Sequence, residues 1–127
     1  LAAAALGGRV YALGGYHGGS LATLERFDPR LRAWEALPPM SMPRASLAAA
    51  AANGRIYALG GERGGALSVA EAYDPSRNSW ETLPPMPSSR SNFAAVACHY
   101  CDAGPRRGHS DIDNYMVTAS CDGCTCS

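Results

Sequence analysis

The sequence has no excess of either charge. Its 127 residues contain 11 Lys plus Arg and 11 Asp plus Glu, so the formal net charge at pH 7 is zero. Nucleic acid and anionic membrane surfaces are recognised by a concentrated basic footprint. We therefore expect neither nucleic acid nor a membrane as the main partner.

Long apolar runs are also absent. None approaches the roughly 20 residues that a membrane-spanning helix needs. The sequence lacks an initiating Met and opens at Leu1, inside the repeat described below. We expect that part of a longer protein precedes Leu1, so any targeting segment lies outside this sequence.

Residues 1–97 contain no cysteine, and all five lie later in the chain, at Cys98, Cys101, Cys121, Cys124 and Cys126. This distribution fits a reducing compartment or a fold that needs no disulfides. We therefore expect a cytoplasmic protein.

What the sequence does contain is a repeat. Residues 8–15 read Gly-Arg-Val-Tyr-Ala-Leu-Gly-Gly, and residues 54–61, 46 positions later, read Gly-Arg-Ile-Tyr-Ala-Leu-Gly-Gly. A fixed period of 20–50 residues is typical of solenoids, propellers and arrays. The same offset relates Asp28-Pro29 to Asp74-Pro75, Trp34 to Trp80, Pro38-Pro39-Met40 to Pro84-Pro85-Met86, and Arg44 to Arg90.

Each period contains signals for four short strands. Asn53-Gly54 is a strong hairpin signal, because both residues tolerate a positive φ. The Gly-Gly pairs permit a tight bend or a close backbone approach, and the Asp-Pro and Pro-Pro pairs end strands. The predicted strands are residues 2–5, 9–13, 21–27 and 33–37 in the first unit, and 48–52, 55–59, 67–73 and 79–83 in the second.

The alanine runs at residues 2–5 and 48–52 are ambiguous, because polyalanine favours helix by propensity. In the third copy the run becomes Phe93-Ala94-Ala95-Val96-Ala97-Cys98. A short run of small apolar residues between turn signals is typical of a strand buried on both faces. We therefore predict strands.

A four-stranded meander has two apolar faces and cannot bury both alone. Stacking copies around an axis buries them, as in propeller blades. Trp34 and Trp80 are then expected as large apolar anchors between neighbouring sheets.

These motifs together resemble the kelch repeat: Gly-Gly after strand two, Tyr73-Asp74-Pro75 after strand three, Trp80 in strand four, and the Pro-Pro-Met…Arg link. The resemblance implies an all-β fold: two four-stranded antiparallel kelch blades, part of a β-propeller ring, over residues 1–98. An irregular C-terminal tail, disordered or non-native, follows at residues 99–127, with only residues 115–117 suited to a strand. The Pro-Pro-Met-Pro pattern is similar to BTB-kelch proteins, the substrate adaptors of cullin-3 ubiquitin ligases, although no BTB segment is present.

Strand direction predicts where partners bind. In a meander, the tight turns share one end of the sheet and the long, variable loops share the other. Binding residues concentrate on loops held by a rigid scaffold. The predicted partner-binding rim consists of Tyr16, His17, Ser46, Glu62, Arg63 and Asn92, and the resemblance supports a peptide or protein partner.

Residues that recur in register are expected to be structural, because repetition across units is typical of scaffold positions. Arg44 and Arg90 are predicted to act alike within each unit, and Met40 and Met86 to fill the core. The same prediction covers Asp28/Asp74, Glu35/Glu81 and the two tryptophans.

The cysteines leave alternatives open. Cys98-x-x-Cys101 and Cys121-x-x-Cys124 have the paired spacing of a zinc site, and His99, His109 or Cys126 could substitute for one ligand. Cys98, however, takes the position of Ala52 inside a predicted strand. We expect a disordered or non-native tail, with zinc or disulfides as the alternatives.

For function we expect a non-catalytic interaction scaffold, such as the substrate-recognition domain of a cullin-3 adaptor, with no cofactor. The alternatives are a fragment of a galactose oxidase-like or sugar-epimerase kelch enzyme, or a truncated fragment without independent function. The repeats offer only His17 as a neutral-pH base and no metal-binding cluster, so a catalytic constellation is not predicted.

Overall fold

The structure, a computed structural model, describes residues 1–99, 110–112 and 115–118. Every regular element in these ranges is a strand. The first sheet has the order β1 (Ala2–Leu6), β2 (Arg9–Leu13), β3 (Leu24–Asp28) and β4 (Ala33–Leu37). The second has the order β5 (Ala48–Ala52), β6 (Arg55–Leu59), β7 (Ala70–Asp74) and β8 (Ser79–Leu83).

All pairings in the two sheets are antiparallel between sequence neighbours, as the meander prediction requires. The alanine runs form β1 and β5 rather than helices. Within the described part of the chain, there is no helix that could cross a membrane.

The third strand of each unit starts three residues later than predicted, at Leu24 and Ala70. In the first unit, the backbone that precedes β3 bonds to the segment 38–47, which we call the first link. Ala22 accepts a hydrogen bond from Met40 N (2.8 Å), and Leu21 accepts one from Arg44 N (3.0 Å). The carbonyls of Leu21 and Ala22 thus hold the link, while Leu21 N and the Thr23 carbonyl bond to the Gly-Gly pair that follows β2.

The turns follow the predicted chemistry. Asn53 and Gly54 have φ values of 49° and 73°, as the β5–β6 hairpin requires. Asp28 Oδ1 accepts hydrogen bonds from the backbone N–H groups of Arg30 (2.9 Å) and Leu31 (3.4 Å), and thereby closes the β3–β4 turn.

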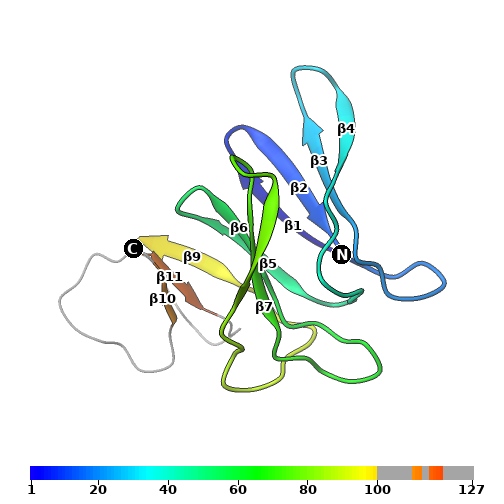
Figure 1. Cartoon of the computed structure of the whole chain (residues 1–127), viewed down its shortest axis with the longest axis vertical. Coiled ribbons are helices and arrows are strands. Elements are labelled where there is room, and N and C mark those ends of the chain that lie inside the picture. Colours follow the sequence, from blue (N-terminus) through cyan, green and yellow to red (C-terminus); the bar gives the residue numbers. More distant parts are fainter. Residues whose placement is uncertain (100–109, 113–114, 119–127) are drawn as a thin grey trace.

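The sheets follow one another in chain order, with β1 beside β5 and β5 beside β9 (Val96–His99) (Figure 1). The main hydrophobic core lies between the first and second sheets. It contains Ala2, Tyr11, Leu13 and Leu24 of the first sheet, Met40 and Leu47 of the first link, and Ile56, Ala58 and Tyr73 of the second sheet.

The two tryptophans do not behave alike. Trp80 is half-buried, packs against this core and donates a hydrogen bond from Nε1 to the carbonyl of Pro38 (2.8 Å). The prediction for Trp34 is wrong, because its side chain is 54% exposed. Trp34 lies on the face of the first sheet that is turned away from the second, where its ring contacts only Phe27 among aromatic neighbours in the described chain (5.2 Å between ring centres).

A third sheet has the order β10 (Ser110–Ile112), β11 (Tyr115–Thr118) and β9. β11 confirms that residues 115–117 can form a strand. The ranges 100–109, 113–114 and 119–127 lie outside the described residues. The division of the chain at residue 98 and the interpretation of residues 99–127 as disordered or non-native therefore stay predictions.

Candidate functional site

The two ends of the sheets carry different connections. The β1–β2 and β5–β6 hairpins, together with the Asp-Pro turns, lie at one end, which we call the turn end. The loops 14–23 and 60–69 and the links 38–47 and 84–95 lie at the other, which we call the loop rim (Figure 1). This arrangement follows from the antiparallel order and places all six predicted partner-binding residues on the loop rim.

Hydrogen bonds join three of these six residues. Ala45 and Glu62 exchange backbone hydrogen bonds (3.1 and 2.8 Å), so the first link pairs with the loop of the next unit. Ser46 Oγ donates to Glu62 Oε1 (3.3 Å), and Asn92 N donates to the carbonyl of Ser46 (3.0 Å). Ser20 Oγ, which sequence reasoning missed, donates to the Glu62 carbonyl (3.5 Å). Ser46, Glu62 and Asn92 therefore form one connected group.

Tyr16, His17 and Arg63 are placed differently. Tyr16 is 73% exposed, and the side chains of His17 and Arg63 are exposed as well. No side-chain hydrogen bond joins them to the described part of the chain. Their loops are nevertheless fixed by the backbone, because His17 N donates to the Gly19 carbonyl (2.9 Å) and Arg63 N to the Gly65 carbonyl (3.1 Å). The result is an aromatic ring and two basic side chains held out into solvent on tight turns.

Ser46 and Asn92 share an unusual backbone conformation, with φ of 53° in both. Residues other than glycine rarely adopt this left-handed region, although Asn tolerates it better than most. Such strained positions cluster at sites of binding or switching. Ser46 and Asn92 each lie two residues after a link arginine, but neither side chain signals a positive φ in the sequence.

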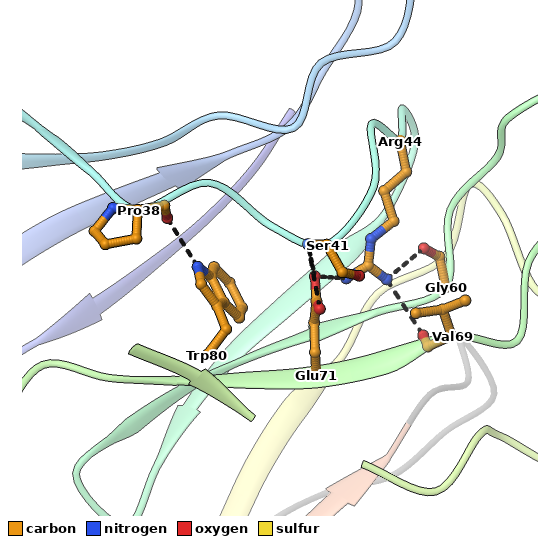
Figure 2. Close-up of polar contacts among 7 residues, drawn as sticks. All are labelled: Pro38, Ser41, Arg44, Gly60, Val69, Glu71 and Trp80. Atoms are coloured by element: carbon orange, nitrogen blue, oxygen red, sulfur yellow. Dashed lines mark hydrogen bonds and ion pairs between the residues drawn. The ribbon is translucent and has the colours of Figure 1, made fainter. Parts of the chain in front are cut away.

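Arg44 of the first link makes a buried polar contact with the second sheet (Figure 2). Its guanidinium Nη2 lies 2.8 Å from Glu71 Oε1, and the two side chains are 0% and 2% exposed. Nη1 donates to the carbonyls of Gly60 (3.0 Å) and Val69 (3.3 Å). Burial lowers the pKa of Arg44, and the charge and hydrogen bond of Glu71 oppose that shift. The structural role predicted for Arg44 is therefore correct, but it acts between units and not within one.

Arg90 does not share this buried position, so the prediction that both arginines act alike is wrong for the burial of their side chains. Arg90 is exposed, and its Nε donates to Ser88 Oγ (3.3 Å). In the third sheet the residue 46 positions after Glu71, Val117, lies in β11, the strand next to β9, so this sheet does not continue the repeat that places Glu71 in β7. The two backbones do act alike: the carbonyls of Arg44 and Arg90 accept hydrogen bonds from Gly15 N (3.2 Å) and Gly61 N (2.8 Å).

The other repeated residues are structural. Met40 is buried in the main core, and Met86 is half-buried against a smaller cluster around Leu59. Glu35 pairs with Arg26 (2.7 Å), and Glu81 lies 3.6 Å from Arg55. Each of these ion pairs stays within its own sheet.

A cleft of about 340 Å³ lies at the turn end of the second sheet. Its charged groups are paired with one another: Arg55 lies 3.8 Å from Asp74, and Arg77 lies 3.9 Å from the same carboxylate. The cleft therefore presents no isolated acid or base. It is lined by Arg55, Ala72, Asp74, Arg77, Ser79, Trp80 and Glu81.

Within the described ranges, no three His, Cys, Asp or Glu side chains gather closely enough to hold a metal ion. The predicted zinc ligands Cys101, Cys121 and Cys124 lie outside the described residues. Of Cys98 only the backbone is described, paired in β9 opposite Met116. The zinc hypothesis therefore stays a prediction.

Comparison with known proteins identifies the repeat. The sequence matches the kelch motif at residues 1–41 and again at residues 43–87, which together cover more than half of the chain. No curated protein matches the sequence closely enough to serve as a relative. Each matched range spans one four-stranded meander and the start of the link that follows it, and the two meanders share a core. The chain belongs to the kelch-repeat family, and its first two sheets are kelch blades of the β-propeller type.

Proposed function

We propose that the loop rim binds a protein or peptide partner through Tyr16, His17, Ser46, Glu62, Arg63 and Asn92. Kelch motifs indicate a protein-interaction β-propeller module. The observation that carries the proposal is the exposed ring of Tyr16, held on a loop that the backbone fixes. Tyrosine and arginine are enriched among the residues that dominate interface energies.

The rim is suited to this role because it is ordered before any partner arrives. The backbone pairing of Ala45 with Glu62, and the bond from Ser46 to Glu62, fix the base of the site. A preorganised surface loses less conformational entropy on binding. Tyr16 and Arg63 then supply the side chains that contact the partner.

The finer proposal concerns the identity of the module. The Pro-Pro-Met-Pro pattern, similar to BTB-kelch proteins, supports a role in substrate recognition for a cullin-3 ubiquitin ligase, with cullin-3 engaged through other domains. A cytoplasmic, non-catalytic module is part of the same proposal. Its support is that His17 is the sole neutral-pH base of the repeats and that the charged groups of the cleft neutralise one another.

The test compares two pairs of exposed residues at opposite ends of the blades. In full-length protein, Tyr16→Ala with Arg63→Ala removes the rim side chains. Leu31→Ala with Arg77→Ala is the matched control, because Leu31 is 76% exposed and the Arg77 side chain 79% exposed at the turn end. Proteins that co-purify with the wild type and the control, but not with the rim variant, would support the proposal.

The opposite pattern, in which partners are lost only with the turn-end variant, would refute the rim assignment. The cullin-3 proposal has its own readout, which is ubiquitylation of a rim-dependent partner with and without cullin-3. Unchanged ubiquitylation in the absence of cullin-3 would refute the finer proposal and leave the rim in place.

A further inference from the structure

The two Asp-Pro turns share a backbone conformation but differ in their side chains. The first Asp-Pro turn, residues 28–32, reads Asp-Pro-Arg-Leu-Arg, and the second, residues 74–78, reads Asp-Pro-Ser-Arg-Asn. The last residue of each turn has nearly the same positive φ, which is 52° at Arg32 and 51° at Asn78. Each turn can therefore serve as the reference for the side chains of the other.

The second Asp-Pro turn is stabilised by its own side chains. Asp74 Oδ1 accepts hydrogen bonds from the backbone N–H (2.9 Å) and the hydroxyl (2.7 Å) of Ser76. Asn78 Oδ1 accepts a hydrogen bond from the hydroxyl of Tyr73. Asparagine also tolerates the left-handed region better than most residues. This turn therefore satisfies both its hydrogen bonds and its backbone conformation.

The first Asp-Pro turn carries an arginine at both of these positions. Arg30 stands in place of the serine, so the described donors to Asp28 Oδ1 are backbone N–H groups alone. Arg32 stands in place of the asparagine, although a residue other than Gly or Asn is strained in the left-handed region. Phe27, in place of the tyrosine, has no hydroxyl to donate. Positions that break a local rule without a structural gain are candidates for function.

Both guanidinium groups are available to a ligand. Arg30 and Arg32 are exposed, and in the part of the chain that the structure describes no carboxylate lies within ion-pair distance of either guanidinium. The acid of the same turn, Asp28, is already engaged by the turn backbone and by Arg9, 3.5 Å from its Oδ2. Two uncompensated cations therefore stand at the tip of the β3–β4 hairpin, at the turn end of the first blade (Figure 1).

We propose that Arg30 and Arg32 bind an acidic segment of a protein partner, in which two carboxylates pair with the two guanidinium groups. The planar guanidinium matches a carboxylate in a bidentate geometry. The short turn fixes the backbone of both arginines, which lowers the conformational entropy that binding costs. This surface lies at the opposite end of the blades from the loop rim, and the proposal does not depend on the rim partner.

The number of free charges favours an acidic protein over the other polyanions. Proteins that bind DNA commonly neutralise about six to ten phosphates, and sites for anionic lipids contain about four to eight basic residues. The neighbouring cations of the turn end are already placed beside aspartates, since Arg9 lies 3.5 Å from Asp28 and Arg77 lies 3.9 Å from Asp74. Two free arginines are sufficient for a short acidic peptide only.

The test follows the arginine Nε–H resonances of the ¹⁵N-labelled full chain. The probe is the synthetic peptide Gly-Ser-Glu-Ser-Glu-Ser-Gly at millimolar concentrations and low salt, and the comparison peptide carries Gln in place of Glu. The single variants Arg30→Ser and Arg32→Asn assign the two resonances. We expect both to shift with the glutamate peptide and not with the glutamine peptide, while the resonance of Arg77, whose side chain is equally accessible, stays in place.

A graft of the second turn separates binding from stability. Arg30→Ser combined with Arg32→Asn gives the first turn the residues of the second. The graft should weaken peptide binding about tenfold, because an exposed ion pair contributes up to about a factor of five and the graft removes two. Its melting temperature should rise by about 3 °C, because Asn relieves the strain. Leu31→Ala with Arg77→Ala, which keeps both arginines, is the matched control and should bind like the wild type.

Four results would overturn the proposal. Equal shifts at all exposed arginines would show unspecific attraction, and unchanged binding by the graft would exclude the two arginines. A lower melting temperature of the graft would mean that the arginines stabilise the turn. Tighter binding to phosphatidylserine vesicles or to single-stranded DNA than to the glutamate peptide, at equal salt, would contradict the class of partner. None of these results bears on the loop rim, which the partner co-purification tests separately.

Discussion

Arg44 and Glu71 join the two kelch blades through a buried ion pair, with 2.8 Å between Nη2 and Oε1. Arg44 comes from the first link and Glu71 from β7, so the contact connects residues that are 27 positions apart in the sequence. Both charges are removed from water, and each depends on the other for compensation.

Removal of Glu71 should therefore be strongly destabilising. We expect Glu71→Ala to lower the free energy of unfolding by about 3 to 5 kcal/mol, because it leaves the buried guanidinium without a counter-charge. Chemical denaturation followed by circular dichroism measures this change. The matched control is Glu25→Ala, at the same position of the preceding repeat, where the exposed carboxylate should matter by less than about 0.5 kcal/mol. Equal effects at both positions would contradict this account of the interface.

The two tryptophans should also respond differently. Trp80→Phe keeps an aromatic ring but removes the donor to the Pro38 carbonyl, and should cost about 1 kcal/mol. Trp34→Phe should change the free energy of unfolding by less than about 0.5 kcal/mol, since the side chain is largely exposed. In the single-tryptophan variants, acrylamide should quench the fluorescence of Trp34 more strongly than that of Trp80. Equal quenching would refute the assigned positions.

Gly60 should not tolerate a side chain. A Cβ at this position would lie 2.6 Å from the carbonyl oxygen of Arg90, and the residue has φ of +57°. Gly18 has a similar φ of +66°, with no atom within 4 Å of an added Cβ. Both alanine variants carry backbone strain of about 1 to 3 kcal/mol, and only Gly60→Ala adds the clash. Thermal unfolding should show the larger loss for Gly60→Ala, and equal losses would mean that the link can move aside.

Protonation of the turn residues Asp28 and Asp74 should lower the stability of the protein in acid. Hydrogen bonds from the backbone N–H of Arg30 lower the pKa of Asp28, and the hydrogen bond from the Ser76 hydroxyl lowers the pKa of Asp74, both from an ordinary value of 3.8. A lowered pKa in the folded state contributes stability that is present above pH 3.8 and is lost as the pH falls through the lower, folded value. Asp74→Asn keeps the turn acceptor but does not titrate. Its urea midpoint should fall less than that of the wild type as the pH is lowered from 5 to 2.

Much of the fold could be predicted from the sequence because each strand and turn signal in the first copy of the repeat can be checked against the second copy. The bounds of β2, β4, β6 and β8 follow from turn residues that occur twice in register. The start of β3 could not be predicted, since the backbone carbonyls of Ala22 and Leu21 bond to link residues that lie 18 and 23 positions further on. Local pattern carries no information about such pairings.

The candidate site shows the same limit. The loop rim followed from strand direction alone, but the group formed by Ser46, Glu62 and Asn92 depends on how a link meets the next blade. The repeat also misled in two places. Equal positions in the repeat predicted equal roles for Trp34 and Trp80, and for Arg44 and Arg90. The burial and the contacts of each of these side chains depend instead on which unit lies next to it.

The distribution of side-chain size across the blades has a geometrical consequence. The innermost strands β1 and β5 are made almost entirely of alanine and lie side by side, whereas the outermost strands carry the tryptophans. Each blade is therefore thin at the axis and thick at the periphery, like a tapered wedge. Because a ring closes only when such wedges add up to a full turn, the methyl groups of β1 and β5 help to set the angle between blades. Larger residues in β1 and β5 would push neighbouring blades apart at the axis. The angle between the blades would then be smaller, and the assembly would be less curved.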